Sequence, residues 1–462
     1  MSFLKPKKNN PAIVLKKNMI VECEILRTGY SCEGISQIGG FIVFIEDTLP
    51  GEKVLVKIIK ITKKYAIGKL LEIIDKSPHR INPECDNSQC GGCQLIFADY
   101  DFQIELKKNI ILSAFKQNAK LEKIPLMDFI KADNKKHYRN KVVLPITMVN
   151  DKIEIGFYAQ RSHRVVNIDD CFLHPEITPE IINIVKNFIS KNKIKIYNEN
   201  TGTGLMRSLM IRTNESSSEI MIVFVINGDT LPGQSDIISN ITSKIPCVKS
   251  IILCKNKNRG NVVMSGNFET IYGKNTITAK LCGYNFLICP DSFFQINFEQ
   301  TEKLYNHIFS LVKNEKNNNI LFDIYSGVSS IGTALSGIVK KIYCLESNPN
   351  ASELAEKIKS MNKINNIQNI HGDSTESLLA LINSSIIPDI VIFDPPRKGC
   401  SINELKTIAE KKVPKVIYVS CNPTTLSRDA KILIDYGYKL KSIQPVDMFP
   451  YTYHVETVAE FT

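Results

Sequence analysis

A cysteine at the end of an apolar run is the first candidate for chemistry, in Val416-Ile-Tyr-Val-Ser-Cys421-Asn-Pro-Thr-Thr425. The β-branched residues before Cys421 predict a buried strand. Pro423 must end it, and Thr424 or Thr425 can cap a helix through Leu426 to Asp435. We therefore expect Cys421 beside a helix N-terminus, where the helix dipole lowers the pKa of a thiol. The alternative is that Cys421 only packs, because cysteines are often buried.

A glycine-containing loop and two acidic residues accompany this cysteine. The loop, Asp323-Ile-Tyr-Ser-Gly327-Val-Ser-Ser-Ile-Gly332, lets a ligand approach the backbone, and Glu346 follows Gly327 by 19 residues, where an acid can bind ribose hydroxyls. A dinucleotide and S-adenosylmethionine both fit this pattern. Asp394-Pro-Pro-Arg397 after a later strand argues against hydride transfer and favours methyl transfer to nucleic acid.

Four further cysteines predict a metal centre: Cys85, Cys90, Cys93 and the distant Cys171. Gly91 and Gly92 allow the backbone to wrap tightly around such a centre. Structural zinc usually takes paired Cys-x-x-Cys turns, whereas three clustered cysteines and one distant partner are more typical of iron–sulfur ligation. From spacing alone we favour iron–sulfur and keep zinc open.

The elements that position these residues form an α/β C-terminal domain from residue 286 to 462. Repeated strand–helix units predict a doubly wound, Rossmann-like sheet. Its expected strands are Leu321–Tyr325, Lys341–Leu345, Ile390–Phe393, Val416–Val419, Lys439–Val446 and His454–Phe461, with a helix over Ile331–Gly337.

Two other domains are expected before it. Residues 1–76 contain short β-patterned runs typical of a small barrel, at Met19–Leu26, Phe41–Ile45, Lys53–Thr62 and Tyr65–Ile74. Residues 77–285 predict an α+β domain that carries the cysteine cluster, with a helix over Tyr100–Leu121 that can pack on the catalytic domain. Within it, Lys135-Lys-His-Tyr138-Arg-Asn-Lys141 suits phosphate contact and base stacking, although a solvated hairpin fits nearly as well.

Composition is consistent with a polyanionic partner. The chain has 462 residues and a net charge of +11, which suggests nucleic acid without identifying it. Its N-terminus lacks the apolar segment of a secretory signal, and no apolar run is long enough for a membrane span. We expect a cytoplasmic protein whose 13 cysteines are thiols or ligands rather than disulfides.

Together these motifs resemble the RNA uracil-C5 methyltransferase family, in its 23S rRNA 5-methyluridine branch with a TRAM barrel and an iron–sulfur cluster. The resemblance also covers Phe293-Phe-Gln295-x-Asn297 and Asp447-Met-Phe-Pro-x-Thr-x-His454-Val-Glu456. It implies a 4Fe-4S cluster on Cys85, Cys90, Cys93 and Cys171. It also implies S-adenosylmethionine contacts from Gln295, Tyr325, Ser330, Glu346, Asp373 and Asp394.

Two departures from the family pattern stand out. Ser326 and Ser329 occupy positions where relatives usually carry Cys and Gly, which affects the expected conformation of the loop. The interval between Cys85 and Cys90 is one residue shorter than the family spacing, and a loop can absorb that difference.

The chemistry of uracil assigns the catalytic roles. C5 is a weak nucleophile, so a thiolate must first add to C6, and we assign this to Cys421. A base must then remove the C5 proton, and we assign this to Glu456, expected to be ionised at an ordinary pKa of about 4.3. Strand alternation places His454, Glu456 and Glu460 on one face. The target base must be flipped out or lie in a loop.

Several alternatives remain open. The resemblance to the 23S rRNA branch implies rRNA as the substrate, and tRNA is the second candidate. A cytosine or amine methyltransferase could use the same acid and cysteine, and a catalytically silent RNA-binding protein could use the barrel and the cluster. We expect the protein to act as a monomer.

Overall fold

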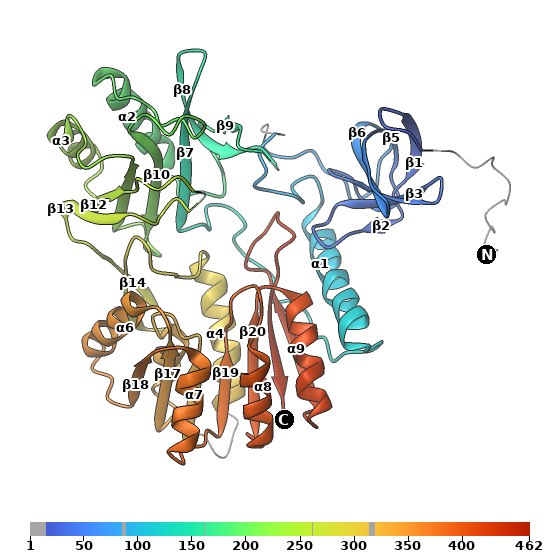
Figure 1. Cartoon of the computed structure of the whole chain (residues 1–462), viewed down its shortest axis with the longest axis vertical. Coiled ribbons are helices and arrows are strands. Elements are labelled where there is room, and N and C mark those ends of the chain that lie inside the picture. The colour runs from blue at the N-terminus through green and yellow to red at the C-terminus, as the bar shows by residue number, and fades with distance from the viewer. Residues whose placement is uncertain (1–14, 86–88, 161, 261, 314–318) are drawn as a thin grey trace. The chain divides into compact units, whose positions relative to one another are not determined.

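The computed structural model describes residues 15–85, 89–160, 162–260, 262–313 and 319–462 (Figure 1). The chain forms two compact units. The smaller unit comprises Met1–Asp86, Cys93–Ile110 and Pro450–His454, and the larger unit comprises Asn87–Gly92, Ile111–Phe449 and Val455–Thr462. Within the described residues, no helix combines the length and hydrophobicity that crossing a membrane requires.

The smaller unit is built on a six-stranded sheet in the order β1-β5-β6-β4-β3-β2. Its strands are β1 (Ile20–Glu24), β2 (Arg27–Thr28), β3 (Gly34–Ile38), β4 (Phe41–Ile45), β5 (Lys53–Ile61) and β6 (Tyr65–Asp75). The four expected strands are confirmed, and β2 and β3 were not expected. Aliphatic residues of these strands, among them Val43, Val54 and Val56, are fully buried and form the core of the unit.

The first part of the larger unit holds a seven-stranded sheet in the order β13-β12-β11-β10-β7-β8-β9. Its strands are β7 (Lys141–Val149), β8 (Lys152–Tyr158), β9 (Val165–Asn167), β10 (Met206–Thr213), β11 (Ile220–Ile226), β12 (Val248–Lys255) and β13 (Asn267–Gly273). Helices α2 (Thr178–Lys191) and α3 (Gln234–Lys244) bury their apolar faces on it, with Ile181, Phe188 and Ile237 in the shared core.

The second part of the larger unit is the expected α/β sheet, in the order β18-β17-β16-β19-β20-β22-β21. Its strands are β16 (Ile320–Ile324), β17 (Lys341–Glu346), β18 (Ile367–His371), β19 (Ile390–Phe393), β20 (Lys415–Ser420), β21 (Leu440–Val446) and β22 (Glu456–Phe461). The first five run parallel, and β22 pairs antiparallel with β20 and β21. The sheet therefore has the doubly wound pattern that the sequence predicted, with β18 unforeseen.

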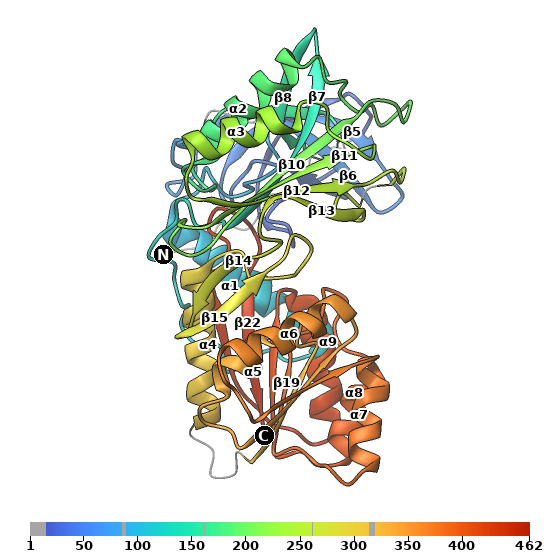
Figure 2. The same ribbon diagram turned by 90° about the vertical axis from the view of Figure 1, so that its left-hand side faces the viewer.

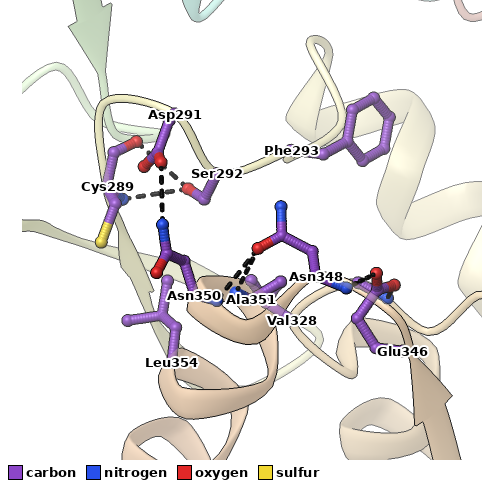
Figure 3. A pocket seen from close by; sticks show the side chains of 11 residues that line it. Cys289, Asp291, Ser292, Phe293, Val328, Glu346, Asn348, Asn350, Ala351 and Leu354 are labelled. Carbon is purple, nitrogen blue, oxygen red and sulfur yellow. Dashed lines mark hydrogen bonds between the residues drawn. The ribbon is translucent and has the colours of Figure 1, made fainter. Parts of the chain in front are cut away.

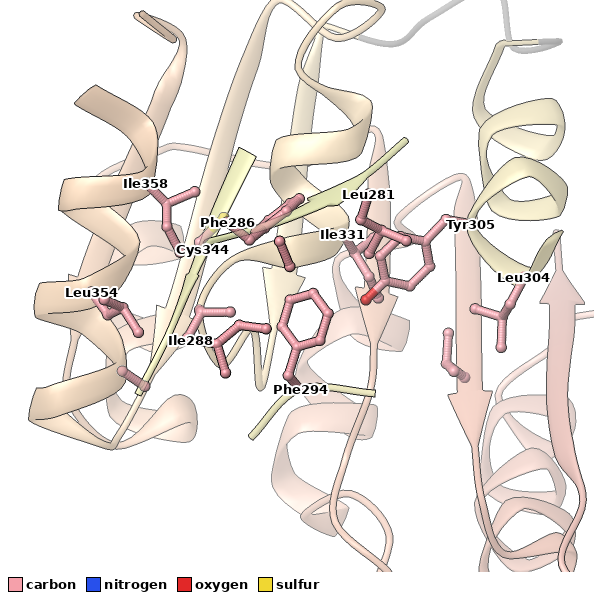
Figure 4. Close-up of a cluster of buried hydrophobic side chains, with 14 of the residues drawn as sticks. Leu281, Phe286, Ile288, Phe294, Leu304, Tyr305, Ile331, Cys344, Leu354 and Ile358 are labelled. Atoms are coloured by element: carbon pink, nitrogen blue, oxygen red, sulfur yellow. The ribbon is translucent and has the colours of Figure 1, made fainter. Parts of the chain in front are cut away.

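Alternate residues of each strand enter opposite cores. On one face, Leu321, Cys344, Ile392 and Ile417 pack with α4 (Phe298–Lys313), α5 (Ser330–Leu335), α6 (Pro349–Met361) and the hairpin β14 (Ile277–Leu281) and β15 (Tyr284–Ile288). Figure 4 shows Cys344 in this core with Phe286, Ile331 and Leu354. On the other face, Phe322, Tyr343, Phe393 and Tyr418 pack with α7 (Ser374–Asn383), α8 (Ile402–Glu410) and α9 (Pro423–Asp435), and Figure 1 shows α8 and α9 beside β20. Both faces of a parallel sheet must be covered, which explains why its strands are apolar throughout.

The helix expected over Tyr100–Leu121 is α1 (Tyr100–Ala114), followed by a π-helical turn, η1 (Phe115–Ala119). In the larger unit, Ile111 and Phe115 join the core beside α9. Asn118 Nδ2 donates a hydrogen bond to Ser427 Oγ at 3.0 Å. Figure 2 shows α4 and the β14–β15 hairpin from the side, next to the α/β sheet that contains β19 and β22.

Candidate active site

Cys421 directly follows β20 and precedes α9, as its sequence context predicted. The N-cap of α9 is Asn422 rather than Thr424 or Thr425, because the Asn422 side chain accepts a hydrogen bond from Thr424 N at 3.1 Å. Pro423 occupies the first helical turn, where its missing N–H carries no cost. The strand end and the helix start thus hold the cysteine between two rigid elements.

The expected low pKa of Cys421 is wrong. Burial raises the pKa of this thiol to about 11, and the nearby carboxyl groups of Glu456 and Asp394 raise it further, whereas Arg397 lowers it. Desolvation disfavours the thiolate more strongly than the local positive charge favours it. Cys421 is therefore a protonated thiol at neutral pH.

Glu456 lies next to Cys421 at the end of the paired strands. Ser420 is opposite Thr457 in the β20–β22 ladder, so the next residue on each strand, Cys421 and Glu456, belongs to the same end. Thr457 Oγ1 also donates to Ser420 O at 3.1 Å. The charge of Glu456 also raises the pKa of the Cys421 thiol, as expected for two residues at the same end of this ladder.

The ordinary pKa expected for Glu456 is also wrong. Its side chain is 4% exposed, and burial raises its pKa well above the ordinary range, with Asp394 raising it further and Arg397 lowering it. The strand β22 begins at Glu456, so His454 lies outside the strand on which we had placed it. Glu460 pairs with Lys415, at the opposite end of β20 from Cys421.

Asp394 stands at the end of β19, one strand away from Cys421. Burial raises the pKa of its carboxyl to about 7. Asp323 on β16 is fully buried, and burial raises its pKa to about 7 as well, with Asp394 and Glu346 contributing in the same direction. Asp323, Asp394 and Glu456, three acidic groups with raised pKa values, thus gather near the carboxyl edge of the sheet, and such clustering is typical of functional sites.

The loop after β16 has the sharp backbone that close ligand approach requires. Tyr325 and Ser329 adopt left-handed conformations, with φ of 66° and 58°. Ser329 thus adopts a left-handed conformation that glycine takes at low cost, and its hydroxyl donates to Asn369 Oδ1 at 2.7 Å. A Cβ at Gly332 would lie 2.6 Å from Cys344 Sγ, so only glycine fits there.

Hydrogen bonds from neighbouring elements fix this loop. Glu346 Oε2 accepts Gly327 N at 2.8 Å, and Glu346 Oε1 accepts Asn348 N at 2.7 Å. Ser330, the first residue of α5, shares a 2.6 Å hydrogen bond with the buried Tyr305 hydroxyl. The bonds to Gly327 and Ser330 hold the turn after β16, and the bond to Asn348 holds the turn after β17.

A cavity of about 160 Å³ opens beside the loop (Figure 3). It brings together the predicted Gly327 and Glu346 with residues that the sequence did not single out. These additional residues are Cys289, Asp291, Ser292, Asn348, Asn350, Ala351 and Leu354. Asn348 caps α6 and precedes a proline, a helix-start signal that could have located this wall.

The segment from Phe293 to Asn297 forms the side of the site opposite α6. Phe293 lines the cavity, is 70% exposed, and in Figure 3 its ring stands apart from the hydrogen-bonded side chains. Gln295 is buried, and its carbonyl accepts a 2.7 Å hydrogen bond from Asn140 Nδ2. Asn297 Nδ2 donates to Met448 O at 3.2 Å.

Asp373 is the N-cap of α7, and one of its carboxyl oxygens accepts hydrogen bonds from the first turn of that helix. Its Oδ1 accepts Thr375 N at 3.0 Å and Glu376 N at 3.1 Å. The structure therefore places Asp373 at a helix start after β18. It joins neither the wall of the cavity nor the group around Cys421.

The basic segment before β7 is not a stacking surface. Tyr138 is only 7% exposed, so the aromatic ring expected to stack on a base is buried. Asn140 is also buried and holds the backbone of Gln295 and Ile296 through its side chain and its N–H. The segment thus supports the Phe293–Asn297 turn.

The four cluster cysteines are divided between the two units, with Cys85 and Cys93 in the smaller unit and Cys90 and Cys171 in the larger one. Among the described residues, no three His, Cys, Asp or Glu side chains gather as metal ligands would. Part of the expected binding loop, residues 86–88, lies outside the described residues. All four cysteines are partly accessible and outside disulfides, and a Cβ at Gly91 would lie 3.2 Å from the Gln160 backbone, because this part of the loop packs closely against a distant segment.

Comparison with known proteins places the chain among RNA methyltransferases. Residues 261–460 match the tRNA (uracil-5-)-methyltransferase family model, and residues 16–71 match the TRAM domain. An uncharacterised RNA methyltransferase of Clostridium acetobutylicum is 40% identical over 449 residues, covering 96% of this chain and 97% of that protein. One of Oceanobacillus iheyensis is 36% identical, covering 97% of each chain.

A solved structure agrees with this placement. The tRNA (uracil-54, C5)-methyltransferase of Pyrococcus abyssi, in complex with S-adenosyl-L-homocysteine, has a TM-score of 0.79 and 27% identity and covers 96% of this chain and 99% of its own. These matches extend over nearly the whole chain. This chain therefore belongs to the RNA uracil-5-methyltransferase family and is an enzyme of that family with a TRAM domain.

Proposed function

We propose that the protein transfers a methyl group from S-adenosylmethionine to C5 of uracil in RNA through a covalent adduct on Cys421. The observation that carries this proposal is the pairing of Cys421 and Glu456 at one end of the β20–β22 ladder, beside Asp394. A nucleophile and a proton acceptor at one strand edge match the two steps that substitution at C5 needs.

Cys421 begins the reaction as a thiol that must lose its proton. Its thiolate adds to C6, and the electron pair of the C5–C6 bond becomes enolate density that makes C5 nucleophilic. Arg397 is the nearby group that lowers the pKa of Cys421, and it therefore favours the thiolate. The adduct holds the base at the strand edge until the thiolate leaves from C6.

Glu456 completes the reaction as a base. After C5 has gained the methyl group, the Glu456 carboxylate removes the C5 proton, the C5–C6 double bond re-forms and the Cys421 sulfur leaves. Because burial favours the neutral acid, Glu456 must lose its own proton before this step. Arg397 lowers the pKa of Glu456 too, so one cation assists both ionisations.

The residues around the cavity fit the cofactor that the relatives imply. When bound, S-adenosylmethionine supplies an electrophilic methyl group on a sulfonium sulfur. We propose that Glu346 and the Tyr325–Ser330 loop hold its nucleoside part, with Gln295, Asp373 and Asp394 as further contacts. The Pyrococcus abyssi enzyme was solved with S-adenosyl-L-homocysteine, which supports this assignment.

We also propose that Cys85, Cys90, Cys93 and Cys171 hold a 4Fe-4S cluster. Four thiols outside disulfides are the donor set that such a cluster takes. Polar methyl transfer from S-adenosylmethionine needs no electron from the cluster. Its role is therefore structural or in positioning RNA. Anaerobic purification with a visible absorption spectrum tests it, and a colourless protein with stoichiometric zinc would refute it.

For the substrate we propose 23S rRNA, with tRNA as the second candidate. Similarity to a tRNA (uracil-54, C5)-methyltransferase supports the second candidate. The exposed lysines of the TRAM domain, Lys60, Lys63 and Lys64, are suited to RNA phosphates in either case. We propose three functional parts, 1–76, 77–285 and 286–462, in a cytoplasmic monomer.

The decisive experiment incubates the protein with labelled S-adenosylmethionine and, separately, unmodified 23S rRNA and tRNA. Label in 5-methyluridine supports the proposal, and the RNA that is labelled identifies the substrate. Label only in 5-methylcytosine or in a methylated amine overturns it. Cys421→Ala should abolish turnover but retain RNA binding. Glu456→Gln should trap a protein–RNA adduct that survives denaturing gels, and its absence contradicts the role of Glu456.

A further inference from the structure

A buried carboxylate on α8 connects three segments around the cofactor loop. Glu404 is fully buried. Its Oε2 accepts the Tyr325 hydroxyl at 2.5 Å and Ser401 N at 3.0 Å. Its Oε1 accepts the Ser374 hydroxyl at 2.5 Å and the Thr375 hydroxyl at 3.2 Å. Four donors therefore occupy the two oxygens of one carboxylate, which has room for about four.

Part of this arrangement is ordinary helix capping. Ser401 and Glu404 form a capping box at the start of α8, in which the glutamate accepts the N-cap N–H. A capping box needs only that one bond from Glu404, and a glutamine can make it. The three hydroxyl donors come from other segments, so capping leaves them unexplained.

The donors lie beside residues that we assign to the cofactor. Tyr325 belongs to the loop after β16, and its left-handed backbone, with φ of 66°, persists only if surrounding contacts hold it. Ser374 and Thr375 form the first turn of α7, directly after the N-cap Asp373. Glu404 thus ties the Tyr325 turn to the α7 start through a single side chain.

We infer that Glu404 is a positioning residue that sets the cofactor pocket by fixing Tyr325 and the Asp373–Thr375 turn together. This inference rests on the proposed function, because it takes both segments as contacts of S-adenosylmethionine. A carboxylate suits this task better than an amide, since all of its hydrogen-bonding sites are acceptors and all of its partners donate. Losing one acceptor leaves a buried hydroxyl without its partner and loosens one of the two segments.

The test measures binding of S-adenosylhomocysteine to the full-length protein by calorimetry. Glu404→Gln keeps the size of the side chain and the cap but replaces one acceptor with a donor. We expect it to weaken binding about ten-fold or more, while affinity for a labelled 23S rRNA transcript stays unchanged. In turnover, KM for S-adenosylmethionine should rise and kcat should change little. Tyr325→Phe, which removes only the hydroxyl, should weaken binding in the same direction.

A matched control separates positioning from general destabilisation. Glu460→Gln also removes a largely buried carboxylate, paired with Lys415 at the opposite end of β20 from Cys421. It should lower Tm without changing the affinity for S-adenosylhomocysteine. The double variant of Tyr325→Phe and Glu404→Gln should lose less than the two single losses combined, because the two groups share one bond.

The outcomes are distinct. If Glu404→Gln lowers Tm as Glu460→Gln does but binds S-adenosylhomocysteine like the wild type, Glu404 is only a helix cap and the inference is wrong. If Glu404→Gln does not fold, unchanged binding by Tyr325→Phe overturns the inference instead. If the wild type itself does not bind S-adenosylhomocysteine, the proposed cofactor is wrong and the inference is overturned with it.

Discussion

The reactivity of Cys421 offers a direct test of its surroundings. Burial raises the pKa of this thiol to about 11, whereas the helix N-terminus alone would lower it. At pH 8 a thiol with that pKa is ionised in about one molecule per thousand. Since only the thiolate is alkylated, the rate for Cys421 should rise about ten-fold per pH unit from pH 8 to pH 10, with no plateau.

The assay is alkylation by iodoacetamide, followed by mass spectrometry of the peptides. The exposed Cys247 is an internal control for reagent and accessibility. Arg397→Gln should slow alkylation of Cys421 further, because Arg397 is the cation that lowers its pKa. Lys398→Gln removes the neighbouring exposed charge and should change the rate less than about two-fold.

A plateau of the Cys421 rate at or below pH 8 would refute this reasoning. It would mean that the helix N-terminus outweighs burial, as the sequence alone suggested. A high pKa instead assigns activation of the thiol to the complex with RNA and cofactor. Equal rates for the wild type and Arg397→Gln would show that Arg397 does not act on the thiol.

Two further predictions concern stability and RNA binding. Burial raises the pKa of Asp323 to about 7, so its contribution to stability is present below about pH 4 and is lost as the pH rises through 7. The side chain of Asp323→Asn stays neutral at every pH. The difference in free energy of unfolding between this variant and the wild type, measured by urea unfolding, should therefore shift in favour of the variant by up to about 4 kcal/mol between pH 4 and pH 8. A difference that does not change with pH contradicts this. Phe293→Ala removes an aromatic ring that is 70% exposed at the cavity and should weaken RNA binding by about 1–3 kcal/mol in filter binding. Equal RNA affinity would exclude stacking by Phe293.

Local pattern was sufficient to predict much of this fold. The β-branched run before Cys421, the strand ending at Phe393 and four strands of the TRAM region were located correctly, because alternating or continuous apolar residues report burial directly. Strand β18 (Ile367–His371) was not expected: its sequence, IQNIH, mixes polar and apolar residues at the edge of the sheet, and such a pattern does not distinguish a strand from a loop.

The sequence by itself determined which side chains could do chemistry: a cysteine after a strand, an acid before two prolines and a glutamate near the C-terminus. Tertiary structure decided their protonation states. Cys421 and Glu456 both favour their neutral forms because burial and the approach of like-charged groups depend on contacts between strands far apart in sequence. It also decided that Tyr138 is buried rather than exposed, and that Glu404 joins Tyr325 to α7, since no local spacing encodes a contact across 79 residues.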